Sequence, residues 1–174
     1  MKLRVCDESR LKDKIEIIEI LAPLAFEIHQ NKSRGIIEER EFEGLFFQYF
    51  KLLHSNANEH EMRREFKEFT NFLRKDAGFF YEKGEDEVGN KLFGFMHLTF
   101  EEYFAAIEMI CRWEEEELNL DEYVFNSRWT EIIRLAAAQL RLSNSSRMGR
   151  KKTTEFVKNI LNVNDPFPEA QRPL

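Results

Sequence analysis

The sequence FGFMHLTFEEYFAA, residues 93–106, joins two patterns of different period. The aromatic run that ends at Met96 is typical of a β-strand, whereas apolar residues after Thr99 recur at helical spacing. Thr99 and Glu102 match the capping box, in which a hydroxyl and a carboxylate three residues later satisfy the exposed N–H groups of a helix start. The stretch therefore predicts a strand followed by a long helix that begins at Thr99.

A hairpin and three helices are predicted before this stretch. Another aromatic run, residues 78–82, is separated from residues 92–96 by a polar, glycine-containing segment, as in a β-hairpin. Apolar residues at helical spacing precede it in three segments, residues 11–30, 38–54 and 59–76. Three helices followed by a hairpin is the element order of a winged-helix domain, with the hairpin as its wing.

Smaller features refine this expectation. Pro23 lies within the first helical segment, where an interior proline removes a hydrogen bond, so we expect a kink or a second helix that starts near Ala22. Residues 35–37 fit a very short strand. Six residues of the long helix are expected to face the core. They are Phe100, Tyr103, Phe104, Ile107, Ile110 and Cys111.

The rest of the chain also predicts helices, over residues 127–142 and 147–161. The acidic run at residues 114–117 is expected to be the solvated end of the long helix, because carboxylates are mildly unfavourable at a helix C-terminus. We therefore expect a mostly α protein with two parts. The first, residues 1–118, is a winged-helix domain with the long helix, and the second, residues 119–174, is the start of a helical array.

Composition and charge limit the classes of protein. The 174 residues are 43% hydrophobic and include 17 Phe, which is enough for an aromatic core. The 26 Lys and Arg residues against 32 Asp and Glu give a net charge of −6, which argues against broad affinity for nucleic acid or anionic lipid. The N-terminal residues lack an apolar signal region, and no window has the ~18 apolar residues of a membrane span. We expect a cytoplasmic protein in which Cys6 and Cys111 are reduced thiols.

No pattern of residues indicates an enzyme. Residues 84–92, GEDEVGNKL, approach the phosphate-loop pattern, but the lysine is one place late and no hydroxyl follows. Three carboxylates would also repel phosphate, so we expect a wing loop there. His29, His54 and His60 lack the spacing of zinc ligands, and no nucleophile elbow occurs. We expect no cofactor or metal in this chain alone.

His97 is the polar residue that stands out. It lies between the aromatic strand and the capped helix, so both elements hold its backbone and its ring is oriented with little loss of entropy. The N-terminus of the following helix carries N–H groups and partial positive charge, which favour anions. From the residues alone two interpretations remain open: a contact to an anionic ligand, and a junction histidine whose ring bonds a backbone carbonyl.

Residues 93–106 resemble the aromatic-x-His-x-x-Phe-x-Glu-Tyr-x-Ala-Ala segment of the winged-helix domain of NACHT-type STAND NTPases, the group that includes NOD-like receptors and their bacterial relatives. The preceding helices and the strand AGFFYEK are similar to the same domain, and the residues from Trp129 onward are similar to the helical repeats that follow it. No Walker motif precedes this module. The resemblance therefore implies a non-catalytic regulatory part of a larger nucleotide switch, without its nucleotide-binding domain.

The resemblance also implies one ligand contact. His97 matches the histidine that contacts the phosphates of ADP in the closed state, while ADP or ATP with magnesium would be held by the nucleotide-binding domain in cis. Glu101 departs from the family's frequent Gln, and we expect it to be exposed. The implied role includes homo-oligomerisation on activation, in signalling or in defence against phage. Four residues match as packing positions, namely Phe95, Phe100, Tyr103 and Ala106.

Two other functions remain open. A DNA-binding winged helix would use the helix over residues 59–76, but five cations there are offset by five anions, which suits groove binding poorly. The five cations of this helix are Arg63, Arg64, Lys67, Arg74 and Lys75. The second alternative to the regulatory role is a stand-alone interaction scaffold. The stretch richest in cations lies outside the winged helix and contains Arg141, Arg147, Arg150, Lys151 and Lys152.

Overall fold

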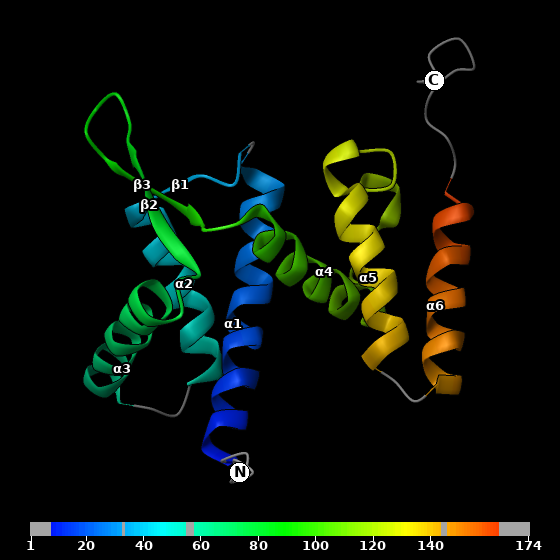
Figure 1. The fold of residues 1–174 in the computed structure, drawn as a ribbon, viewed down its shortest axis with the longest axis horizontal. Helices are drawn as coiled ribbons and strands as arrows, with labels where there is room; N and C mark the ends of the chain where they lie inside the picture. The colour runs from blue at the N-terminus through cyan, green and yellow to red at the C-terminus, as the bar shows by residue number, and fades with distance from the viewer. Residues whose placement is uncertain (1–7, 33, 55–57, 144–145, 164–174) are drawn as a thin grey trace, which may run out of the picture. The chain divides into compact units, whose positions relative to one another are not determined.

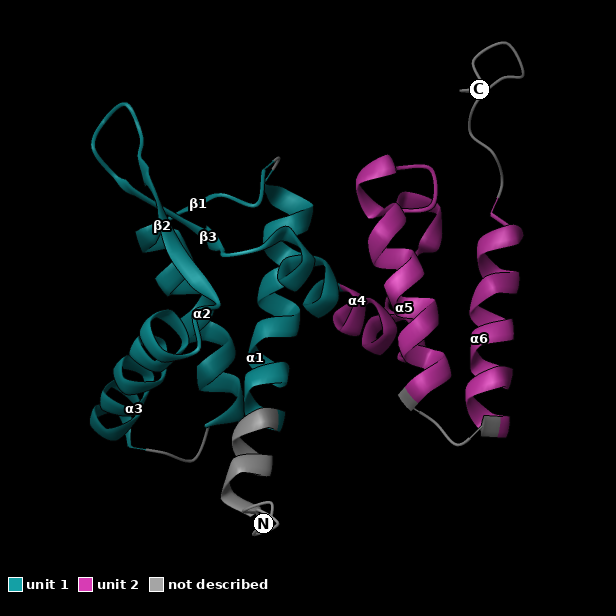
Figure 2. Ribbon diagram, viewed as in Figure 1, with its two compact units in different colours: residues 1–105 teal, residues 106–174 magenta. Residues whose placement is uncertain are grey.

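The chain folds into helices and one small sheet (Figure 1). The structure is a computed structural model, and it describes residues 8–32, 34–54, 58–143 and 146–163. The described part is mostly helical, as predicted from the sequence. It divides into two compact units, residues 1–105 and 106–174 (Figure 2).

The boundary between the two units falls inside the long helix α4 (Leu98–Glu114), between Ala105 and Ala106. The sequence instead predicts a boundary after residue 118, beyond the end of this helix. The difference has a simple origin, because a helix of 17 residues has enough turns to contribute to two cores. The first turns of α4 belong to the first unit and the remaining turns to the second.

Three helices open the first unit, as predicted. They are α1 (Glu8–Asn31), α2 (Glu39–Leu53) and α3 (Glu59–Asn71). The predicted third helix extends to Asp76, and the structure adds that its last turn, Phe72–Asp76, is π-helical. Pro23 does not divide α1, which continues through it as one helix. Around the proline, apolar residues from Ile20 to Ile28 are buried on nearly all sides, and this packing outweighs the lost hydrogen bond.

The sheet has three antiparallel strands in the order β1-β3-β2. The predicted hairpin forms from β2 (Phe80–Glu85) and β3 (Lys91–Phe95), in which Phe80 lies opposite Phe95. The very short strand is present as β1 (Ile37–Glu38), which overlaps the predicted residues 35–37 only at Ile37, and it pairs with β3. The strand β3 is therefore central, and it leads directly into α4.

Phenylalanine rings from α2 and from the hairpin form the core of the first unit. Phe42 lies on Phe80 with ring centroids 4.8 Å apart, and Phe80 lies 4.5 Å from Phe95. Phe46 extends the cluster to Phe66 of α3 at 5.2 Å. Edge-to-face and tilted arrangements of this kind suit the quadrupole of the rings. The aromatic core predicted from the composition is thus confirmed in this unit.

The buried face of α4 differs from the prediction. Among the six residues expected to face the core, only Phe104 is buried, while Phe100 and Cys111 are exposed and the other three are half-buried. The buried stripe instead contains Glu101, Phe104, Ala105, Ala106 and Met109. The reason is Glu101. The polarity of a carboxylate predicts that it faces solvent, and placing Glu101 in solvent rotates the predicted buried stripe away from the observed one. The helix also begins at Leu98, so Thr99 is its second residue and not its N-cap.

Helices α5 (Thr130–Ser143) and α6 (Ser146–Leu161) form most of the second unit, as predicted. Two short 3-10 turns, Leu120–Glu122 and Ser127–Trp129, precede α5. Aromatic contacts stabilise this unit. The ring centroids of Trp113 and Phe156 are 5.1 Å apart, and those of Tyr123 and Trp129 are 4.5 Å apart. Within the described residues, no helix is both long enough and apolar enough to cross a bilayer.

Candidate functional site

His97 lies in a turn between β3 and α4 whose backbone is anchored on both sides. We call residues 96–98 the His97 turn. On the strand side, the Met96 N–H donates to the Phe79 carbonyl at 2.8 Å, and on the helix side the Phe100 N–H donates to the His97 carbonyl at 3.0 Å. These two hydrogen bonds hold the Cα of His97 between a sheet and a helix. The junction predicted from the sequence is therefore present.

The side chain of His97 is exposed, and so are the apolar side chains of residues close to it in sequence. Met96 is 41% exposed, Leu98 58% and Phe100 37%. The Phe100 ring lies 5.6 Å from the His97 ring and packs edge-on against Phe79 at 5.5 Å, so it links the histidine to the hairpin. We call Met96, His97, Leu98 and Phe100 the His97 surface. It combines one polar hydrogen-bonding ring with apolar area that water does not favour.

The residue after Phe100 belongs to a buried pair of titratable side chains. His29, in the last turn of α1, and Glu101, in the first turn of α4, are 4% and 2% exposed. The imidazole Nδ1 lies 2.8 Å from Glu101 Oε1, across 72 positions of sequence. The prediction that Glu101 is exposed is thus wrong, because a histidine partner compensates its burial.

Two glycines allow the chain to close around this pair. Gly35 has a φ of 64°, and a Cβ there would overlap Glu101 Oε2 and lie 3.1 Å from its Cδ. Gly94 of β3 faces it, because a Cβ at Gly94 would lie 2.7 Å from the Gly35 carbonyl oxygen. The carboxylate, the segment after α1 and the central strand therefore meet at van der Waals distance.

The loop between β2 and β3 is closed by Asp86. Its Oδ1 accepts from the Val88 N–H at 2.9 Å and the Asn90 N–H at 2.8 Å, and its Oδ2 accepts from the Asn90 side chain at 2.9 Å. These bonds, led by the one from the Asn90 side chain, lower the pKa of the Asp86 carboxyl. A phosphate loop needs free backbone N–H groups, whereas these are already bonded. The segment is thus a loop between two strands of a hairpin, and the wing remains a prediction.

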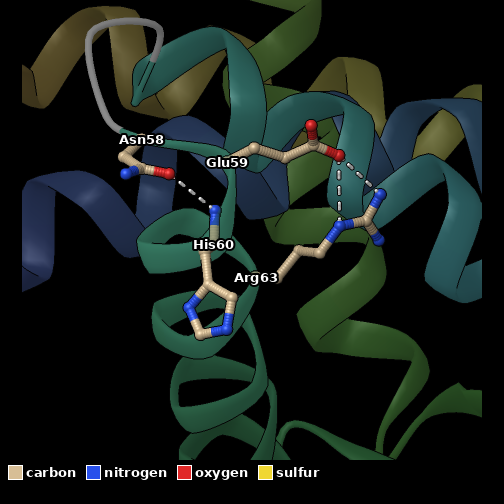
Figure 3. A network of polar contacts seen from close by, with 4 residues as sticks. All are labelled: Asn58, Glu59, His60 and Arg63. Atoms are coloured by element: carbon tan, nitrogen blue, oxygen red, sulfur yellow. Dashed lines mark hydrogen bonds and ion pairs between the residues drawn. The ribbon is translucent and has the colours of Figure 1, made fainter.

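The remaining described histidines have separate surroundings. His54, at the end of α2, stacks on Phe50 and bonds Glu16 of α1 through Nε2 at 2.8 Å. His60 is exposed at the start of α3 (Figure 3). In the part of the chain that the structure describes, no three His, Cys, Asp or Glu side chains gather closely enough to hold a metal ion.

Of the two cysteines, Cys6 lies outside the described residues and Cys111 is a free thiol on α4. Although the residue is exposed as a whole, burial of the thiol raises its pKa, and the nearby Glu108, Glu115 and Glu114 add to the rise. A raised pKa keeps the thiol protonated at neutral pH, so Cys111 is a poor nucleophile.

Two cations of α3 and of the π-helical turn after it are paired with glutamates, one from α3 and one from α2. Arg63 donates through Nη2 to Glu59 at 3.0 Å, next to the N-cap formed by Asn58 (Figure 3). Arg74 lies 3.5 Å from Glu39 and over the Phe93 ring. These contacts add to the balanced charge of the helix and further disfavour groove binding. In α6, Lys152 pairs with Glu114.

The sequence points to His97 but not to its support. His29 and Glu101 are 72 positions apart, so no local sequence pattern links them. They come together only because α1 contacts α4 in the folded structure. Gly35 gave a partial signal, since a glycine just after a helix often adopts a positive φ. Its contact with Glu101 is a tertiary feature.

Comparisons of this chain with protein-family models, with curated proteins and with solved structures found no significant match.

Proposed function

We propose that this chain is the regulatory part of a NACHT-type STAND NTPase, in which a winged-helix domain contacts ADP held by a nucleotide-binding domain. The observation that carries the proposal is an exposed histidine on a turn anchored at both ends, within the sequence FGFMHLTFEEYFAA. The helical order and the three-stranded sheet around the turn support the winged-helix assignment. The chain itself would perform no catalysis.

The geometry suits the recognition of a phosphate group. An imidazole N–H donates well to a phosphate oxygen, and the start of α4 adds the positive end of the helix dipole. The apolar side chains of the His97 surface would exclude water on docking, which strengthens a hydrogen bond to a charged group. The nucleotide-binding domain would supply the phosphate loop and magnesium.

A switch follows if the two nucleotide states differ in their contacts with His97. A ligand shifts an equilibrium only by its differential affinity for the two states. ADP that bonds His97 only in the closed arrangement would stabilise that arrangement. Its loss would release this module and free surfaces for assembly with further copies, as signalling or defence against phage requires.

Replacing the histidine in the intact protein tests the proposal. We expect His97→Ala to speed ADP release by roughly 10- to 100-fold, since hydrogen bonds to charged groups contribute about 1.5–3 kcal/mol. The measurement is the dissociation rate of a fluorescent ADP analogue, together with the basal oligomeric state. The control is His60→Ala, which removes another exposed histidine of the first unit. Equal release rates in the two variants would refute the proposal.

The coding sequence upstream of Met1 provides an independent test. Translation in frame should reveal a strand, a Gly-x-x-x-x-Gly-Lys-Ser/Thr loop and a helix, which together form a phosphate site. A stop codon directly before Met1, with no separate phosphate-loop protein that binds this chain, would contradict the proposed role.

A further inference from the structure

The helical turn that follows the His97 turn contacts α1 through Glu101, a residue that has no part in the proposed function. Glu101 lies in the first turn of α4, four residues after His97, which lies in the turn just before that helix. Whereas His97 is exposed, Glu101 points inward and bonds His29 of α1. The exposed candidate ligand contact is therefore followed directly by a helical turn that is anchored through a buried polar contact.

The burial of His29 and Glu101 makes the hydrogen bond between them energetically important. A carboxylate that is 2% exposed has lost its hydration, and the bond to His29 Nδ1 at 2.8 Å compensates for it. If either partner is removed, the buried side chain that remains loses this hydrogen bond. The backbone at Gly35 lies against the carboxylate, because a Cβ there would overlap Glu101 Oε2, so Glu101 is confined on that side. The position of Glu101 is thus closely specified.

We propose that His29 and Glu101 are positioning residues that hold the His97 turn in the geometry required for its ligand. The end of α1 and the start of α4 then move as one piece. A displacement of α1 that separates the pair would release the first turn of α4, and the His97 carbonyl would lose its bond from the Phe100 N–H. We call the holding of the His97 turn the mechanical part of this inference, and its effect on ligand binding the functional part. Only the functional part rests on the proposed role of His97.

The structure offers a matched control. His54 and Glu16 form a second histidine–glutamate contact in the same unit, also at 2.8 Å, but this pair is about one-quarter exposed and joins α1 to the end of α2. It shares the chemistry and the distance of the His29–Glu101 pair and does not touch the His97 turn. A specific positioning effect must appear at the first pair and not at the second.

Amide hydrogen exchange on the full chain tests the mechanical part. The reporters are the N–H groups of Met96 and Phe100, which anchor the His97 turn, and the reference is the Met62 N–H in α3. We expect Glu101→Ala and His29→Ala to raise reporter exchange at least ~10-fold more than reference exchange, since local opening reports local stability. Glu101→Gln, which keeps an acceptor for His29, should give a smaller rise, and Glu16→Ala and His54→Ala should give none.

Two results would overturn the inference. One is equal acceleration at the reporters and at the reference, which would make the pair a contributor to general stability alone. The other is the same reporter exchange in the Glu101 and Glu16 variants. If Glu101→Ala does not give a folded spectrum, Glu101→Gln compared with Glu16→Gln decides in the same way.

The functional part is separated by ADP release from the intact protein. Glu101→Ala should speed release in the direction of His97→Ala, with Glu16→Ala unchanged. If reporter exchange rises while neither Glu101→Ala nor His97→Ala affects release, the positioning of the turn stands and the proposed function fails. If His97→Ala speeds release but Glu101→Ala changes neither release nor exchange, the positioning role fails and the proposed function stands.

Discussion

Gly35 satisfies two requirements at once. Its φ of 64° favours glycine, and its missing Cβ leaves space for the buried carboxylate of Glu101. A residue outside every regular element thus shapes the support of His97. The sequence marks the position only as the end of a helix, because the second requirement comes from a residue 66 places later.

We expect Gly35→Ala to destabilise the protein by about 1–3 kcal/mol from the backbone alone, with a further loss from displacement of Glu101. The measurement is the urea unfolding midpoint. Gly44→Ala is the matched control, because Gly44 is exposed in the middle of α2 with nothing near its missing Cβ. This control should gain roughly 0.5–1 kcal/mol from helix propensity. Equal effects of the two substitutions would contradict the packing described at Gly35.

At the scale of elements, the hairpin depends on a short loop whose polar side chains bond one another. Asp86 accepts three hydrogen bonds at the mouth of the turn, two of them from Asn90.

The contact between α5 and α6 in the second unit depends instead on the absence of a side chain. At Gly149 of α6, a Cβ would lie 2.7 Å from the Arg141 carbonyl oxygen and 3.0 Å from that of Leu140.

The Asp86 loop should respond to pH in one direction. The folded pKa of this carboxyl lies below its ordinary value of 3.8, so its contribution is fully present above that value and is lost as the pH falls through the folded pKa. We expect the Val88 and Asn90 amide resonances to titrate with a midpoint below 3.8. In Asp86→Asn this titration should vanish. A midpoint at or above the ordinary value would show that the carboxylate is not bonded as described.

Replacing Gly149 tests the contact between α5 and α6. Alanine would gain about 1 kcal/mol in helix propensity but must push two backbone carbonyls away, and overpacking costs typically 1–3 kcal/mol. We therefore expect Gly149→Ala to lower stability while Gly44→Ala raises it. Thermal unfolding followed by circular dichroism measures both. Stabilisation by Gly149→Ala would mean that the two helices lie farther apart.

At the scale of the whole molecule, the balance of charge limits the partners. The net charge is −6, and Arg63 and Arg74 of the region formed by α3 and its π-helical turn are already bonded to glutamates. A net negative charge opposes binding to the phosphate backbone of nucleic acid.

We expect no salt-dependent binding of duplex DNA between about 50 and 200 mM salt, a range in which phosphate contacts weaken steeply. Fluorescence anisotropy with a labelled duplex measures this. Binding that falls with salt and is lost in Arg63→Gln/Arg64→Gln would instead support the DNA-binding alternative. The matched variant Arg150→Gln/Lys151→Gln, on α6, removes the same charge from another helix and identifies the surface responsible.

The sequence by itself determined the order and type of the elements. Helical spacing of Phe42, Phe46 and Phe50 and the aromatic runs of the hairpin are local signals, so they could be interpreted without knowledge of the fold. The same holds for the place of His97 between a strand and a helix. Local patterns do not state which face of a helix is buried when a polar residue lies on it.

Only the tertiary structure decided the support of the candidate site. Glu101 is buried because α1 brings His29 to it, and Pro23 stays within one helix because packing surrounds α1. The boundary inside α4 likewise depends on which turns pack into which core. Each of these features is a long-range contact, and the energy that it contributes is absent from any short window of sequence.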